Sequence, residues 1–261
     1  MDGKLTRQDR RALLKQDAKW LAQPLVLGGD PRSMAAHVRH VFNLLRDTRA
    51  ESPCSQAVAH VTGVFDRTAP PHKEIACRKG CSHCCTQKVV LMAPEAFYVA
   101  AQIRNNPKAK DAIIEAHRRT HDLSLMGRLQ AQIFCALLED TMCSIYKARP
   151  LACHAFVSTD LNACLDAFTR NKSANIPLPE IYVSVVHTCR FLLLAALRLA
   201  RLNSSVYEMN AAVAAILAHE NAEARWLAGE NILAGVPAEA PPPPQFEQAI
   251  RQMAAHVAPT L

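Results

Sequence analysis

Four of the chain's ten cysteines fall within residues 77–85, in the run CRKGCSHCC. Thiolates repel one another, so such crowding indicates a site where a soft or borderline metal ion binds them. The spacing Cys-x3-Cys-x2-Cys lets the chain curl round one centre, and Gly80 permits the backbone angles that such a curl needs. Adjacent side chains generally point apart. We therefore expect either that the Cys84–Cys85 pair bridges to a second metal ion or that only one member of the pair is a ligand.

A second cysteine segment, CSIYKARPLACH, covers residues 143–154, and Cys135 lies eight residues upstream of it. In this segment Arg149 is placed to stabilise the negative charge of a thiolate-rich site, and Pro150 to start a short helix that presents Cys153 inward. Taken alone, the segment is equally well explained as an ordinary helix that contains cysteines.

The spacing of the cysteines does not determine which metal binds. Four ligands complete a structural zinc site, and four thiolates also hold an iron–sulfur cluster. Two nearby residues stay undecided: His83 is more typical of a solvent-facing position, and Cys135 suits a core as well as a ligand shell. The surroundings of Cys54, Cys164 and Cys189 are apolar and helical, which predicts packing roles.

Together the two segments resemble the YkgJ-like cysteine cluster family, whose signature is CxxxCxxCC and which is associated with zinc or iron chelation. The resemblance runs from Cys77 to Phe156, with CxxxCxxCC and CxIYxxRPxxC in the expected order. His154 stands where the family favours arginine. The resemblance implies a metal site but no particular reaction, so we assign no catalytic residue. The implied ligands are Cys77, Cys81, Cys84, Cys85, Cys143 and Cys153.

Composition favours a helical fold, because only eight glycines occur in 261 residues and alanine and leucine are abundant. We predict a mainly α fold: an irregular helical domain with a short, β-containing, cysteine-rich metal-binding segment. We expect four regions, namely an N-terminal helical region (1–70), the cysteine cluster domain (71–175), a C-terminal helical region (176–240), and a proline-rich linker with a tail helix (241–261).

Capping signals give the expected elements. Thr6 with Asp9, Asp30-Pro31 and Ser52-Pro53 predict three helices in the first 70 residues. Residues 88–92 read as extended. Further helices are expected over residues 95–103, 112–121, 179–202, 205–217 and 221–233, and after the prolines of 241–244.

The formal net charge is +7, but the cations are scattered and aromatic residues make up only 5%, so we expect a solvated basic surface and no nucleic-acid partner. The first twenty residues lack an apolar core of the signal-peptide type. The most apolar stretch, residues 181–200, carries His187 and Arg190, so we expect a buried helix and no membrane span. A cytoplasmic location, where thiols stay reduced, follows as an expectation.

The leading functional prediction is a metal-binding protein that chelates zinc or iron through the cysteine cluster. The first alternative is an iron–sulfur enzyme or electron-transfer protein, with methyl transfer as an analogy because flagellin lysine methylases carry related CxxxCxxCC motifs. The second is a thiol redox sensor that uses Cys84 and Cys85. The metal ion is the expected partner, and the sequence indicates no particular protein partner.

Overall fold

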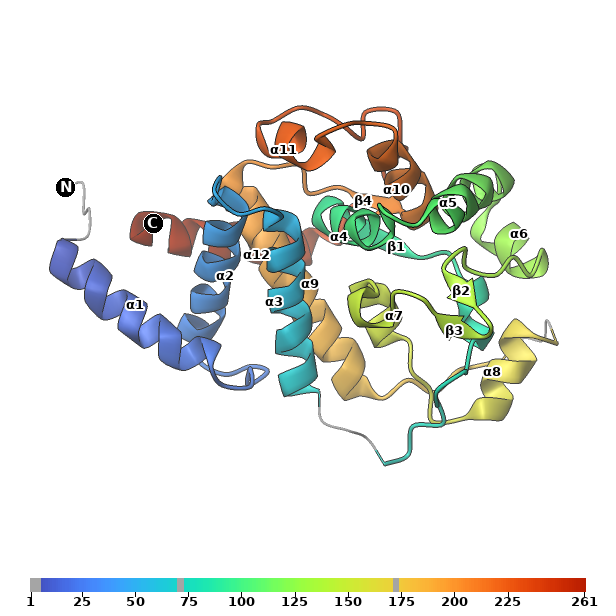
Figure 1. Ribbon diagram of the computed structural model, residues 1–261. Helices are drawn as coiled ribbons and strands as arrows, with labels where there is room; N and C mark the ends of the chain where they lie inside the picture. Colours follow the sequence, from blue (N-terminus) through green and yellow to red (C-terminus); the bar gives the residue numbers. More distant parts are fainter. Residues whose placement is uncertain (1–5, 70–72, 171–173) are drawn as a thin grey trace. The chain divides into compact units, whose positions relative to one another are not determined.

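The structure, a computed structural model, describes residues 6–69, 73–170 and 174–261 (Figure 1). Within these residues the chain forms twelve α-helices and two antiparallel two-stranded sheets. The predicted mainly α fold is therefore confirmed. The expected boundary between residues 70 and 71, and the start of the cysteine-rich segment at residue 72, lie outside the described residues.

The chain divides into two compact units, each built from segments that are not contiguous in sequence. We call the first the helical unit; it comprises Met1–Pro70, Ser184–Ser204 and Ala240–Leu261. We call the second the cysteine unit; it comprises Pro71–Val183 and Ser205–Glu239. Each is described by itself below.

The helical unit contains the three predicted N-terminal helices and the predicted tail helix. Its elements are α1 (Arg7–Leu21), α2 (Pro31–Arg46), α3 (Pro53–Thr68), most of α9 (Glu180–Ala200), α12 (Pro244–Val257) and the 3-10 turn Ala258–Thr260. Thr6 and Asp9 form the expected capping box, and the Asp30 side chain accepts the N–H of Arg32. Each satisfies donors that the first turn of a helix leaves free.

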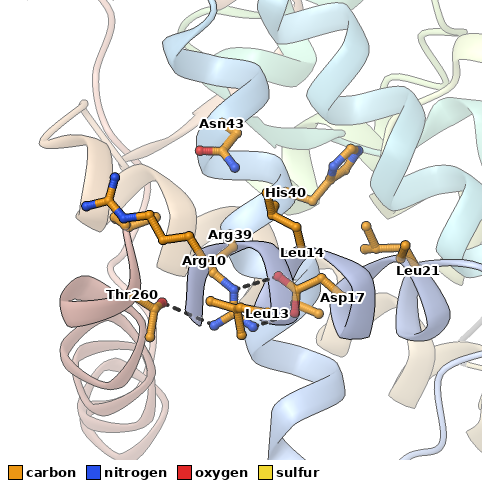
Figure 2. Close-up of a pocket in the computed structure, with 12 residues that line it drawn as sticks. Arg10, Leu13, Leu14, Asp17, Leu21, Arg39, His40, Asn43 and Thr260 are labelled. Atoms are coloured by element: carbon orange, nitrogen blue, oxygen red, sulfur yellow. Dashed lines mark hydrogen bonds and ion pairs between the residues drawn. The ribbon is translucent and has the colours of Figure 1, made fainter. Parts of the chain in front are cut away.

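Helix α2 packs against α1, α3 and α12, and its apolar face forms the centre of this unit. A buried ion pair fixes α1 to α2, because Arg39 donates to the Asp17 carboxylate at 2.8 and 2.6 Å. Arg39 also donates to Thr260 Oγ1 at 3.2 Å, which secures the end of the chain (Figure 2). Breaking such a pair from one side is costly, since it leaves an uncompensated buried charge.

Within the described residues, α9 alone is long and apolar enough to cross a membrane by length and composition. Of its most apolar 18-residue window, 61% is buried in the structure. The core helix of a globular protein shows the same burial. The sequence predicts such a buried helix for residues 181–200.

The cysteine unit is organised around three helices that pack on one another, α4 (Ala93–Ile103), α5 (Pro107–Thr120) and α10 (Met209–Leu217). Two short helices, α6 (Leu125–Gln130) and α11 (Ala222–Leu227), belong to the same unit. The rings of Phe97 on α4 and Trp226 on α11 lie 5.4 Å apart between centroids. Both side chains are buried, so α11 closes one side of the core.

Residues 205–217 were expected to be one helix, but their first part is a strand. Strand β4 (Val206–Glu208) pairs antiparallel with β1 (Val90–Met92), and α10 begins only at Met209. Valine and tyrosine suit a strand, and Tyr207 lies opposite Leu91 in the buried part of the sheet. Glu208 then caps α10 by accepting the N–H of Ala211.

The helix expected over residues 221–233 is shorter than predicted. Helix α11 ends at Leu227, and Gly229 has a φ of +101°, a backbone conformation that terminates helices. Ile232 and Leu233 are nevertheless buried. Their apolar character, which extended the helical pattern in the sequence, therefore reflects packing of the following turn.

Candidate metal centre

Gly80 turns the chain within the first cysteine motif. Its φ is +83°, as the sequence predicted for a residue that allows the chain to curl. The N–H of Cys81 donates to the Arg78 carbonyl at 2.9 Å and closes the turn. A side chain at Gly80 would begin 3.5 Å from Thr141 Oγ1, so the turn lies close to the second cysteine segment.

Cys84 and Cys85 lie in a single 3-10 turn, η1 (His83–Thr86). A hydrogen bond joins their two thiols. This bond is the main cause that lowers the pKa of Cys84 to about 7, and it also raises the pKa of Cys85. The two side chains therefore do not point apart, contrary to the expectation from their adjacency, and both can serve neighbouring ligand positions.

Cys135 and Cys143 reach this turn through a small hairpin, β2 (Leu138–Glu139) and β3 (Met142–Cys143). The two residues between the strands have positive φ angles of 46° and 65°, as in the tight turns that join such strands. The N–H of Cys135 donates to the Cys85 carbonyl at 2.7 Å. A backbone bond therefore fastens the second segment directly to the first motif.

Cys153 is carried by the short helix α7 (Leu151–Ala155), which begins after Pro150 as predicted. Its N–H donates to the Pro150 carbonyl at 2.9 Å. The N–H of Leu151 donates to the buried carboxylate of Glu95 at 2.9 Å. Burial raises the pKa of the Cys153 thiol, and so do the nearby negative charges of other cysteines, which are Cys135, Cys84 and Cys143.

Cys164 is a candidate ligand that sequence reasoning missed. It is buried on α8 (Leu161–Phe168), a helix that packs against η1. Ser158 connects it to the first motif: the Ser158 N–H donates to Cys77 Sγ at 3.4 Å, and the Ser158 hydroxyl shares a hydrogen bond with the Cys164 thiol. The N–H of Ala76 also donates to the Ser158 carbonyl at 2.8 Å. In the sequence, the apolar helical surroundings of Cys164 predicted a packing role and gave no sign of its position near Cys77.

The thiols of the cysteine unit form two groups that share one member. We define the first sulfur group as Cys77, Cys81, Cys84 and Cys164, because burial and then the charges of neighbours within this set raise the pKa of Cys77 and of Cys164. We define the second sulfur group as Cys84, Cys85, Cys135, Cys143 and Cys153, since the pKa values of Cys85, Cys135 and Cys153 are raised in part by charges within this set. Cys84 acts on members of both groups.

Arg149 places a positive charge beside these thiols. It favours the thiolate form and so lowers the pKa of Cys84, Cys143 and Cys153 against the effect of burial. Its guanidinium carbon lies 4.3 Å from the centre of the Tyr146 ring, and its Nη2 lies 3.5 Å from Nδ1 of His154. Burial, followed by the charge of Arg149, lowers the pKa of His154 to about 3. A neutral imidazole thus stands next to Cys153.

A second cation, Arg128, approaches the centre from α6. Arg128 and Glu208 form a largely buried ion pair at 2.7 Å. Burial raises the pKa of Cys135 to about 11, whereas the charge of Arg128 opposes that rise. The partners lie 80 positions apart in the sequence, so no local spacing could have predicted the pair.

Three further candidates have other contacts. Nδ1 of His83 lies 3.3 Å from Thr169 Oγ1, which directs that ring toward α8. Cys54 and Cys189 are fully buried in the helical unit, in agreement with packing roles, and the Cys189 thiol donates to the Val61 carbonyl at 3.2 Å.

None of the ten cysteines forms a disulfide bond among the described residues, and those from Cys77 to Cys153 are half-buried. In the part of the chain that the structure describes, no three His, Cys, Asp or Glu side chains are already arranged to hold a metal ion. Ligation therefore requires deprotonation and rotation of thiols that already lie near one another. A donor set made of thiols fits zinc and iron, which thiolates bind in four-coordinate shells.

Residues 76–181 match the family model CxxCxxCC, described as a putative zinc- or iron-chelating domain. This segment is therefore similar to the CxxCxxCC family. The match covers less than half of the chain, and it includes every member of both sulfur groups. No curated protein and no solved structure matches the chain. The match confirms the predicted family resemblance and supports metal binding by this segment.

Proposed function

We propose that the CxxCxxCC domain of this chain binds two metal ions, zinc or iron, through its two sulfur groups. The observation that carries the proposal is that hydrogen bonds tie separate cysteine stretches to the first motif: the N–H of Cys135 donates to the Cys85 carbonyl at 2.7 Å, and Ser158, next to the helix that carries Cys164, donates to Cys77 Sγ at 3.4 Å. Eight thiolates provide two four-coordinate shells, the number of ligands that zinc takes in structural sites. Cys84 would complete the first shell, and Cys85, Cys135, Cys143 and Cys153 would form the second.

The proposed ligands are the six cysteines expected from the sequence together with Cys135 and Cys164. Cys135 is supported by its backbone bond to Cys85, and Cys164 by its link through Ser158 to Cys77. A full thiolate shell leaves no open coordination position, so a zinc centre of this kind would stabilise the fold of the cysteine unit. Arg149 and Arg128 would offset part of the excess negative charge.

Metal and sulfide analysis of protein purified without oxygen tests the proposal. The zinc form should be colourless and hold about two ions per chain. The iron–sulfur form should be brown and release acid-labile sulfide, which would favour an electron-transfer or enzymatic role. Protein that is folded, metal-free and unable to take up either metal would contradict the proposal.

Single substitutions locate the ligands. Cys81→Ser and Cys164→Ser should each lower the metal content at the first sulfur group, and Cys153→Ser at the second. Cys84→Ser should affect both. Cys54→Ser is the matched control, because Cys54 is a buried thiol of the helical unit. Equal metal loss in Cys54→Ser and Cys81→Ser would count against the assignment.

A thiol redox sensor is the second candidate, and the hydrogen bond between Cys84 and Cys85 favours it. A thiol with a pKa of about 7 is about half in the reactive thiolate form at neutral pH. Alkylation distinguishes the two functions. If the protein as purified is alkylated quickly at Cys84, the thiol is free and sensing is supported. If alkylation becomes fast only after a chelator is added, a metal ion protects it.

A further inference from the structure

Three histidines gather in the helical unit, on two neighbouring helices. His37 and His40 stand three residues apart on α2 and therefore share a face, and His60 comes from α3. Nδ1 of His37 lies 3.0 Å from Nε2 of His60. The ring centroids of His40 and His60 are 4.4 Å apart, and those of His37 and His60 are 5.2 Å apart. Neither sulfur group contributes a residue here.

Their surroundings keep these rings neutral. His37 is fully enclosed, while His40 and His60 are half-buried. Burial is the main cause that lowers the pKa of His37 to about 4 and of His60 to about 3, and it lowers the pKa of His40 as well. Nε2 of His37 is buried without a hydrogen-bond partner among the described residues, which leaves Nδ1 as the nitrogen directed at another ring.

We propose that His37, His40 and His60 form a second kind of metal site, for a divalent cation that prefers imidazole nitrogen, such as zinc, cobalt or nickel. Two nitrogens bound to one tetrahedral zinc ion at 2.0–2.1 Å lie about 3.3 Å apart. The His37 and His60 nitrogens, at 3.0 Å, need to separate by only a few tenths of an ångström. The cation would take the place of the one proton between these two nitrogens, and that proton would move to the other nitrogen of its own ring, so that both imidazoles stay neutral.

The three rings are not yet arranged around one point, so His40 must rotate toward His60. His40 is free to do so because it lines a cavity of about 250 Å³ bounded by α1, α2 and the end of the chain (Figure 2). That cavity gives a path for the ion and room for water as a fourth ligand. Three imidazoles with an open position resemble catalytic zinc sites more than closed structural ones.

Two charges act on the site in opposite senses. Asp17, which also lines the cavity, raises the pKa of His37 and His40 and so favours positive charge there. Arg67 lowers the pKa of His37 and His60 and so disfavours it. Removal of the Arg67 charge should therefore tighten cation binding, although Arg67 would not be a ligand.

Cobalt(II) is the probe, added to the full chain after its cysteine centre has been loaded with zinc. We expect one additional cobalt ion with weak visible bands, since thiolate ligation would instead give strong near-ultraviolet charge-transfer absorption. His40→Gln and His60→Gln should weaken this binding at least about tenfold. His256→Gln, which alters an exposed histidine of the same unit, should leave it unchanged.

Arg67→Met keeps all three imidazoles and should bind cobalt roughly fivefold more tightly. Equal cobalt uptake by the wild type, His40→Gln and His60→Gln, each shown to be folded by circular dichroism, would overturn the proposal. So would folded wild-type protein that takes up no additional cobalt. The Cys84→Ser variant should still bind cobalt at the histidine site. Loss of the histidine site can therefore be distinguished from loss of the cysteine centre.

Discussion

The Glu95 carboxylate accepts the backbone N–H of Leu151 at 2.9 Å, which fastens the start of α7 to the first turn of α4. Its other oxygen accepts the N–H of Met92, also at 2.9 Å. Glu95 is only 1% exposed, so both bonds form away from water. Because α7 carries Cys153, this carboxylate helps to position one cysteine of the second sulfur group.

Glu95→Ala should lower the free energy of unfolding by about 2–4 kcal/mol, because two buried N–H groups lose a charged acceptor. Metal content should fall with it. Urea unfolding and metal analysis check both effects. Glu115→Ala is the control, since Glu115 is exposed and its carboxylate pairs with Arg118 on the surface of α5. Equal destabilisation by the two substitutions would contradict the role given to Glu95.

Gly80→Ala should destabilise the metal-loaded protein by about 1 kcal/mol, because a side chain is strained at a φ of +83°. The turn that presents Cys77 and Cys81 should then bind metal more weakly, which a chelator competition measures. Gly235→Ala is a matched change in the same unit, at a glycine with open space and no positive φ. The idea fails if Gly235→Ala loses as much metal affinity as Gly80→Ala.

Arg149→Ala should raise the pKa of the Cys84 thiol, since the guanidinium charge favours the thiolate. In chelator-treated protein, the pH at which alkylation of Cys84 reaches half its maximal rate should therefore move upward. Metal affinity should decrease modestly. Arg149→Lys retains the charge and should shift the profile less. An unchanged profile in Arg149→Ala would show that the charge does not act on this thiol.

The histidines of the helical unit predict acid sensitivity in protein kept free of added metal. His37 and His60 have folded-state pKa values of about 4 and about 3, below the ordinary value of 6.5. The unfolded chain therefore binds protons first as the pH falls below 6.5, and stability that is complete above that pH is lost toward the folded-state values.

Between pH 7 and pH 5 we expect the free energy of unfolding to fall by about 2 kcal/mol for each of these two rings. Urea midpoints measured across that range, in the presence of a chelator, test it. His60→Gln should flatten the dependence because it removes one titrating ring, whereas His256→Gln should not. A wild-type profile that is flat from pH 7 to pH 5 would contradict the prediction.

Local signals sufficed for the elements that depend on neighbours in sequence. The caps at Thr6 and Asp30, the turn at Gly80 and the start of α7 after Pro150 all follow from residues within a few positions. The mainly α fold class followed from composition, because alanine and leucine favour helices wherever they stand. Each of these features is fixed by backbone preferences and short-range hydrogen bonds.

Long-range pairing could not be predicted in this way. The strand at Val206 forms because β1 offers a partner more than a hundred residues earlier, and the strand preference of valine and tyrosine alone does not identify that partner. Cys164 likewise reads as a small apolar residue of an amphipathic helix until α8 is packed against η1. Such residues acquire their roles from tertiary contacts.

The pairing of β1 with β4 has a practical consequence for expression of residues 76–181 alone, the segment that matches the family model. A fragment that stops at residue 181 would lack β4 and α10, and so would expose the edge of β1 and a face of α4 that α10 covers. Open strand edges invite intermolecular association. We therefore expect such a fragment to be recovered as aggregate, and a soluble version to require the residues up to Glu239.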